Sequence, residues 1–182
     1  FDKKFYIYLP SYLAPPFIIT GLLFYQVHIA NEKSWSLELL ATSFMFYGLF
    51  SVIGLLIGGP LVDKFKTRLL IPAYLIPMFF GILMLLISDK QIIIIIYMSL
   101  ISLSTGLGIP MMGSLWAELY GVLNLGAIRS LLHAIGVFST ALSPFLFGLF
   151  IDYNLGINFI CIFCLIFIFI SVLLTYFYRN YK

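Results

Sequence analysis

Long apolar stretches separated by short polar ones dominate the chain. At about 20 residues per bilayer crossing, they predict six membrane-spanning helices and no large polar domain. The expected helices are Tyr6 to Ala30, Leu37 to Val62, Leu69 to Ser88, Ile92 to Met112, Ala127 to Ile151 and Ile157 to Tyr178. Because six is an even number of crossings, both ends of the chain lie on the same side of the membrane.

Composition agrees with an integral membrane protein of the all-α class. Hydrophobic residues make up 63% of the chain, charged residues 9%, and the mean hydropathy is +1.12. Enzyme signals are weak, since the chain has no P-loop, no metal-ligand cluster and no pair of carboxylates within the membrane. Ser114 with His133 is the obvious nucleophile and base pair, but Ser114 lacks a G-x-S-x-G turn. We therefore expect no enzyme activity, no cofactor and no metal.

The ten basic residues are unevenly distributed between the two sides of the predicted bundle. Two of them, Lys33 and Lys90, lie on one side. The other eight lie on the side of the termini: Lys3, Lys4, Lys64, Lys66, Arg68, Arg129, Arg179 and Lys182. Because cytoplasmic loops are enriched in Lys and Arg, this distribution predicts cytoplasmic termini. Spread over separate loops, the bases do not indicate nucleic-acid binding.

Two similar segments indicate an internal repeat. The second helix ends in Gly59-x-x-x-Asp63 and the fifth in Gly148-x-x-x-Asp152, 89 positions later. Each acid closes the middle helix of a three-helix unit, the first spanning residues 1–90 and the second 91–182. Because three crossings are an odd number, the two units have opposite orientations, which is the pattern of an inverted-topology repeat.

Helix breakers and small polar residues distinguish some helices from plain membrane anchors. We expect the first helix to be interrupted by Pro10, Pro15 and Pro16, and the fourth by the segment from Thr105 to Pro110. On the second helix, small and weakly polar residues recur every three or four positions and predict a helix-helix interface rather than a lipid-facing surface. They are Ser43, Tyr47, Ser51, Gly54 and Gly58.

The fifth helix carries the strongest polar face. Its members at helical spacing are Arg129, His133, Gly136, Thr140 and Ser143. Ionisable groups inside a membrane are costly and indicate function, and an imidazole can carry a proton near neutral pH. The alternative for His133 is a neutral histidine bonded to a neighbouring helix. For Arg129 it is a side chain that reaches the membrane surface or pairs with Glu118.

Weaker candidates lie on the first and fourth helices. His28 shares a helix face with Tyr25 near the end of the first helix, where it could contact substrate or simply lie in the headgroup layer. Ser102 and Thr105 could bond substrate or their own helix carbonyls.

The loop after the second helix contains the most distinctive motif. From Gly59 to Arg68 it reads G-x-L-x-D-K-x-x-x-R, and it resembles the loop signature of the major facilitator superfamily of secondary transporters, with Lys66 where that pattern usually has glycine. The segments from Trp116 to Ser130 and from Ser139 to Asp152 resemble the C-terminal half of bacterial members, closest to the monocarboxylate and oxalate/formate branch.

This resemblance implies half of a twelve-helix transporter that works by alternating access. The chain would supply helices seven to twelve, with the N-terminal six-helix half as its partner, in a bacterial inner membrane. Residues of the loop would act as gate and hinge: Gly59, Asp63, Lys64 and Arg68. A small monocarboxylate, with or without a coupling proton, is the favoured substrate; the alternatives are drug or metabolite efflux and a six-helix channel-like or structural protein. Because the first, second and fourth helices have no Lys or Arg in their interiors, a charge on the substrate would fall to His133, His28 or the other half.

Overall fold

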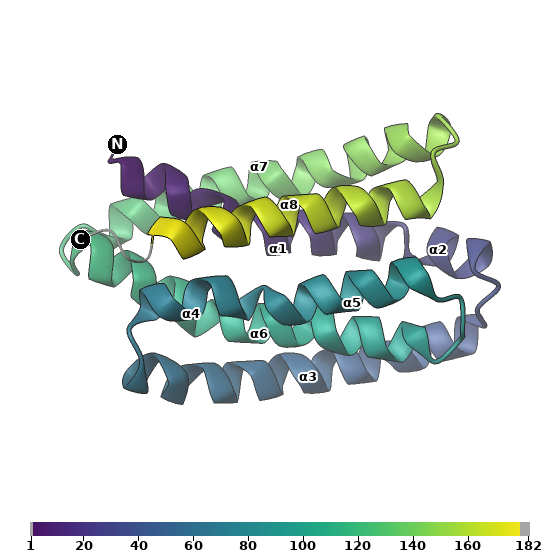
Figure 1. Cartoon of the computed structure of the whole chain (residues 1–182), viewed down its shortest axis with the longest axis horizontal. Coiled ribbons are helices and arrows are strands. Elements are labelled where there is room, and N and C mark those ends of the chain that lie inside the picture. The colour runs from purple at the N-terminus through teal and green to yellow at the C-terminus, as the bar shows by residue number, and fades with distance from the viewer. Residues whose placement is uncertain (1, 179–182) are drawn as a thin grey trace.

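The computed structural model describes residues 2–178, and every regular element in that range is an α-helix (Figure 1). The elements are α1 (Lys3–Phe24), α2 (Gln26–Glu32), α3 (Leu37–Lys64), α4 (Thr67–Tyr74), α5 (Ile76–Ile87), α6 (Ile93–Tyr120), α7 (Leu125–Asp152) and α8 (Gly156–Tyr178). With α4 and α5 forming one crossing, six helical segments are long and apolar enough to span a membrane. The predicted all-α fold with six spans is confirmed. Arg179 and Lys182 lie outside the described residues.

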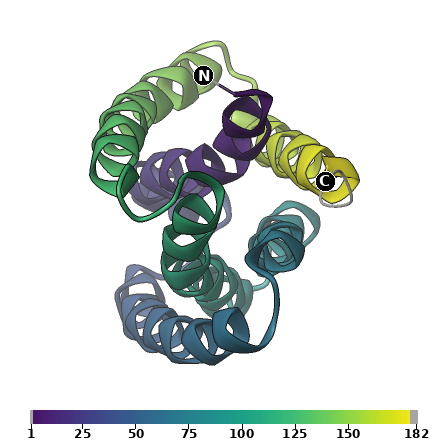
Figure 2. The ribbon, with the colours of Figure 1, turned by 90° about the vertical axis from the view of Figure 1, so that its left-hand side faces the viewer.

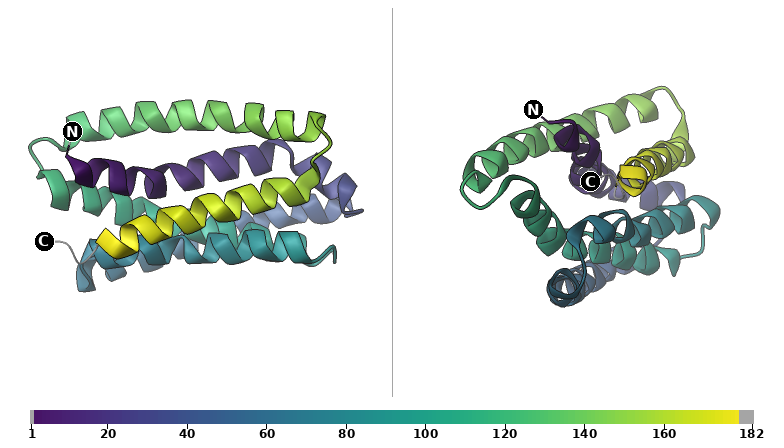
Figure 3. Two further views of the ribbon diagram at one scale, coloured as in Figure 1. Left: turned by 45° about the horizontal axis from the view of Figure 1, so that its top comes forward. Right: turned by 60° about the vertical axis from the view of Figure 1, so that its left-hand side comes forward.

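The helices form two groups that lie side by side. One contains α1, α7 and α8, and the other contains α3, α6 and the α4/α5 pair (Figure 2). Helix α8 joins the groups, since it packs on α1 and on both α4 and α5 (Figure 3). The N-terminus and the α3–α4 and α6–α7 loops share one end of the bundle, which we call the basic end.

Local signals set several helix ends. Ser36 caps α3 by accepting a hydrogen bond from the Leu39 N–H at 3.2 Å, while Glu38 in the first turn and Lys64 in the last complement the helix dipole. Gly121 ends α6 with φ of 75°, a conformation that glycine adopts without strain. Helix α6 consequently runs eight residues beyond the predicted end at Met112.

The expected proline interruptions of the first and fourth helices are wrong. Helix α1 continues through Pro10, Pro15 and Pro16, and breaks only at Tyr25; α6 continues through Pro110. Proline removes one N–H and so leaves a carbonyl four residues earlier without its helical partner. For Pro15 that carbonyl belongs to Ser11, and it accepts a hydrogen bond from the Tyr74 hydroxyl of α4 instead.

The third span contains a break that the sequence pattern did not reveal. Helix α4 ends at Tyr74 and α5 begins at Ile76, with Pro77 in its first turn. At this break the Tyr74 carbonyl accepts a hydrogen bond from the Ser104 hydroxyl of α6. Tyr74 is fully buried. Its two hydrogen bonds, to Ser11 and from Ser104, tie α4 to both α1 and α6.

The predicted interface on the second span is confirmed, and it faces α6. A Cβ on Gly54 would lie 2.5 Å from the Leu103 carbonyl oxygen, and one on Gly58 would lie 2.7 Å from the Pro110 ring. Conversely, a Cβ on Gly106 would clash with the Ser51 carbonyl oxygen. The two backbones approach closely because these positions have no side chain. Gly59 does not take part, since a Cβ there would meet open space.

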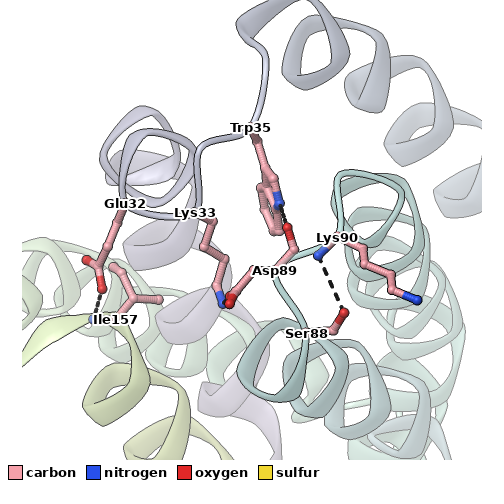
Figure 4. Close-up of polar contacts among 7 residues, drawn as sticks. All are labelled: Glu32, Lys33, Trp35, Ser88, Asp89, Lys90 and Ile157. Atoms are coloured by element: carbon pink, nitrogen blue, oxygen red, sulfur yellow. Dashed lines mark hydrogen bonds and ion pairs between the residues drawn. The ribbon is translucent and has the colours of Figure 1, made fainter.

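At the opposite end, polar contacts fasten three helix ends together (Figure 4). Lys33 Nζ lies 2.5 Å from Asp89 Oδ1, and the Trp35 indole N–H donates to the Asp89 carbonyl at 2.7 Å. Glu32 accepts a hydrogen bond from the Ile157 N–H of α8 at 3.3 Å. We call these residues the polar clasp.

Candidate functional site

The main cavity lies among α1, α4, α6 and α7, has a volume of about 740 Å³ and extends inward from the basic end. The lining residues fall into an aromatic and aliphatic wall and a polar wall. The apolar wall contains Tyr12, Pro15, Pro16, Tyr74, Ile109, Met112, Trp116 and Leu132. The polar wall contains Thr105, Arg129, Ser130 and His133. Two glycines of α6, Gly108 and Gly113, also line the cavity.

Of the described residues, Arg129 and His133 bring the only basic side chains to this lining. They lie one helical turn apart on α7, and both side chains are exposed in the described chain. The guanidinium reaches toward α6, since a Cβ on Gly113 would lie 3.4 Å from its Nη2 atom. No Asp or Glu lines the cavity. The predicted polar face thus meets the cavity at these two residues, where a bound anion would encounter positive charge.

The anticipated pairing of Arg129 with Glu118 is wrong. Glu118 instead lies 3.5 Å from the Nε atom of Arg68, at the start of α4. Sequence proximity favoured Arg129, but α4 packs against α6 and brings Arg68 to Glu118. Arg129 makes no ion pair within the described residues, which leaves its charge available to the cavity.

The remaining residues of the predicted α7 face do not line the cavity. Gly136 packs close to Tyr12, whose hydroxyl would lie 3.6 Å from a Cβ at that position. The Thr140 hydroxyl donates to the Val137 carbonyl of its own helix at 2.7 Å. Ser143 is fully buried beside Gly21.

Tyr25 and His28 lie beyond the end of α1 that is opposite the basic end, away from the main cavity. The Tyr25 hydroxyl donates to the Pro144 carbonyl of α7 at 3.1 Å. His28 Nε2 lies 3.6 Å from Glu32 Oε2 on the next turn of α2. The Tyr25 contact joins the end of α1 to α7, whereas the His28 contact lies within α2, and neither residue is part of the cavity lining.

The candidates on the second and fourth spans are mostly inside helix interfaces. The Ser43 hydroxyl donates to the Leu40 carbonyl and the Ser102 hydroxyl to the Ser99 carbonyl, and both residues are fully buried. Ser51 contacts α6 at Gly106. Thr105 is the exception: it lines the cavity, although its hydroxyl also donates to the Ile101 carbonyl at 2.9 Å. Tyr47 of α3 lies close to the Thr105 side chain.

A second, shallower cavity of about 500 Å³ lies at the basic end, beside the charged loop. Asp63, Lys64 and Glu118 line it. Asp63 is exposed and has no ion-pair partner in the part of the chain that the structure describes. At the base of this cavity the Thr67 and Ser114 hydroxyls lie 3.1 Å apart. The loop therefore exposes a carboxylate at Asp63 and an ammonium group at Lys64, neither of which has an ion-pair partner among the described residues.

Sequence reasoning missed the aromatic wall of the main cavity. Tyr12 and Trp116 come from helices far apart in sequence. Trp116 is 2% exposed, and its ring lies 6.4 Å from that of Tyr12 at an interplanar angle of 80°. Neither residue has a sequence signal that separates cavity lining from ordinary helix packing.

The comparisons with known proteins agree with this architecture. The chain matches the family model described as Major Facilitator Superfamily over residues 8–182. It matches no curated protein and no solved structure. The six spans and the match over most of the chain lead to the same conclusion: this chain belongs to the Major Facilitator Superfamily of membrane transporters.

Proposed function

We propose that the protein performs secondary active transport of a small organic anion, such as a monocarboxylate, by alternating access. The observation that carries this proposal is the main cavity, where Arg129 and His133 face a space without any lining carboxylate. A guanidinium binds a carboxylate through two parallel hydrogen bonds, so Arg129 is the natural anchor. His133, one turn away, is placed to contact the same anion or to carry a coupling proton.

The test is uptake of radiolabelled pyruvate by the full-length protein in proteoliposomes. Arg129→Gln should lower transport at least tenfold, because one charge-assisted contact contributes about 1.5–3 kcal/mol. Lys90→Gln is the matched control, since it removes an exposed base in the loop at the opposite end. Equal uptake in both variants and the wild type would remove Arg129 from the site. If the protein moves no anion at all but exports cationic drugs, the efflux alternative replaces this proposal.

The partner of this bundle is proposed to be a second six-helix half. The apolar stretches of α3 and α7 are only 17% buried, against 50% in α1 and 56% in α6. Helix α7 carries the polar wall of the cavity, so a half that covers α3 and α7 would also close the substrate site. Such an arrangement fits two halves that rock about a central cavity.

Asp63 is proposed to act as a gate residue of the charged loop, together with Gly59, Lys64 and Arg68. Its exposed carboxylate is suited to meet the positive N-terminus of a helix from the other half. Asp63→Asn should leave insertion unchanged but slow transport about two- to fivefold, the effect of a charge–dipole contact of ~0.3–1 kcal/mol. Normal uptake at matched expression would limit Asp63 to a role in membrane topology.

The basic end is proposed to face the cytoplasm. Lys66 and Lys90 are exposed at opposite ends of the bundle and suit cysteine labelling, whereas Thr67 is buried. A cysteine at Lys90 should react with an impermeant thiol reagent added to intact cells, and one at Lys66 should react only after the membrane is opened. The reverse pattern would invert the topology.

A further inference from the structure

The apolar wall of the main cavity is large compared with its charged part. Eight of the lining residues are aromatic, aliphatic, Met or Pro, and they come from α1, α4, α6 and α7. The cavity volume of about 740 Å³ lies in the range of pockets that bind ligands with a substantial apolar body. A two- or three-atom anion would leave the accessible part of this wall, chiefly Ile109 with parts of Tyr12 and Pro16, in contact with water.

The aromatic rings form a corner of the apolar wall. Tyr12 and Trp116 meet nearly at right angles, and Trp116 stacks on Tyr120 behind it at a centroid distance of 6.1 Å. The ring of Tyr74 is held in the wall by its hydrogen bond to Ser11 and by Gly108, where a Cβ would lie 2.9 Å from the ring. These contacts hold the aromatic surface in place before a ligand binds, which lowers the entropy cost of binding.

The charge is confined to one side. Arg129 and His133 both project from α7, while the wall from α1 and α6 contributes rings and aliphatic groups. A ligand that satisfies both sides has one anionic group at one end and an apolar body at the other.

We infer that the substrate is an organic monoanion with an aromatic or alicyclic body, such as a ring-bearing carboxylate, rather than formate, oxalate or another small polar anion. This inference rests on the proposed transport function of the same site and narrows its substrate class. The physical reason is that the apolar wall contributes affinity only when a ligand displaces water from it, by roughly fourfold for each buried methylene. Arg129 disfavours a cation of the same shape.

The experiment compares four radiolabelled probes with the full-length protein in proteoliposomes: benzoate, cyclohexanecarboxylate, formate and oxalate. Benzoate and cyclohexanecarboxylate should be taken up with an apparent affinity at least about tenfold higher than that of formate. Tetraphenylphosphonium, which is apolar but cationic, should not be transported. Thermal stabilisation of the purified protein by the same probes gives a second readout that does not depend on turnover.

The outcomes separate this inference from the proposed function. Preference for formate or oxalate overturns the inference and leaves organic-anion transport standing. Transport of tetraphenylphosphonium alone overturns both. Absence of uptake and of stabilisation by the two ring carboxylates also overturns the inference.

A pair of variants tests whether the apolar wall causes the preference for ring-bearing carboxylates over formate. Ile109 lines the cavity and is 59% exposed in this chain, so Ile109→Asn changes the wall at little cost in folding. It should weaken benzoate uptake at least about fivefold and formate uptake by clearly less. Leu123→Asn, in the fully exposed α6–α7 loop outside the cavity, is the matched control and should change neither. Equal loss for benzoate and formate in Ile109→Asn would contradict the role of the wall.

Discussion

The hydroxyl of Tyr74 donates its hydrogen bond to the main-chain oxygen of Ser11, the carbonyl that Pro15 leaves without a helical partner. The same tyrosine accepts a hydrogen bond at its own carbonyl from Ser104. Tyr74 therefore takes part at two backbone irregularities: it supplies the donor in α1, and Ser104 supplies the donor at the break between α4 and α5. In a membrane interior, where water cannot replace a missing partner, such compensation is what permits helix-breaking residues.

Removing the Tyr74 hydroxyl should destabilise the protein. Tyr74→Phe leaves the buried Ser11 carbonyl unpaired, and we expect a loss of about 1–3 kcal/mol in the free energy of unfolding. Thermal unfolding of the detergent-solubilised protein measures it, with Tyr153→Phe as control, because Tyr153 is 75% exposed. In a Pro15→Ala background the helix supplies its own N–H, so the same substitution should cost about 1 kcal/mol less. Equal losses in both backgrounds would contradict the compensation.

The contact between α3 and α6 should tolerate no side chain at Gly106. A methyl group there would clash with the Ser51 carbonyl, and because that obstacle is backbone it cannot rotate away. Gly106→Ala should therefore cost about 1–3 kcal/mol. Gly48→Ala is the matched control, since a Cβ at Gly48 meets open space. Thermal stability and the yield of monodisperse protein in detergent are the measurements, and equal stability of the two variants would contradict close packing.

The stability of the polar clasp should depend on the pairing of its charges. The Lys33 side chain is only 6% exposed, whereas that of Asp89 is 78% exposed. Asp89→Asn leaves a largely buried ammonium without its counterion, and we expect a loss of about 1–2 kcal/mol, moderated by the exposure of Asp89. Lys33→Met combined with Asp89→Asn should be less destabilised than Asp89→Asn alone, because no buried charge then remains unpaired. A double variant as unstable as the single one would show that the pairing contributes nothing.

His133 should control the pH dependence of transport if it binds substrate or carries a proton. It lines the cavity and makes no hydrogen bond within the described residues, so replacement by Gln should not disturb packing. His133→Gln should flatten the dependence of uptake on pH between 5 and 8, the range in which imidazole ordinarily titrates. Uptake by proteoliposomes at matched protein content is the measurement. An unchanged profile would remove His133 as a coupling group, and Arg129→Gln would still test anion binding separately.

The sequence by itself determined the number of membrane crossings and the face of α7 that carries Arg129 and His133. Both follow from local regularities: a bilayer requires apolar runs of a set length, and a helix brings residues three or four apart to one side. The glycines of the α3 face likewise marked a contact surface, because small residues in a membrane helix let another backbone approach. None of these inferences required knowledge of which helices are neighbours.

Only the tertiary structure decided which distant groups meet. Pro15 reads as a helix breaker in sequence, but Tyr74, 59 positions away, supplies the missing donor. Glu118 is closer in sequence to Arg129 than to Arg68. The packing of α4 on α6 nevertheless places Arg68 beside Glu118, and Arg129 lines the cavity instead. The aromatic wall arises in the same way. Partners of this kind are set by which helices pack together and at what depth, and periodicity along a single helix carries no information about either.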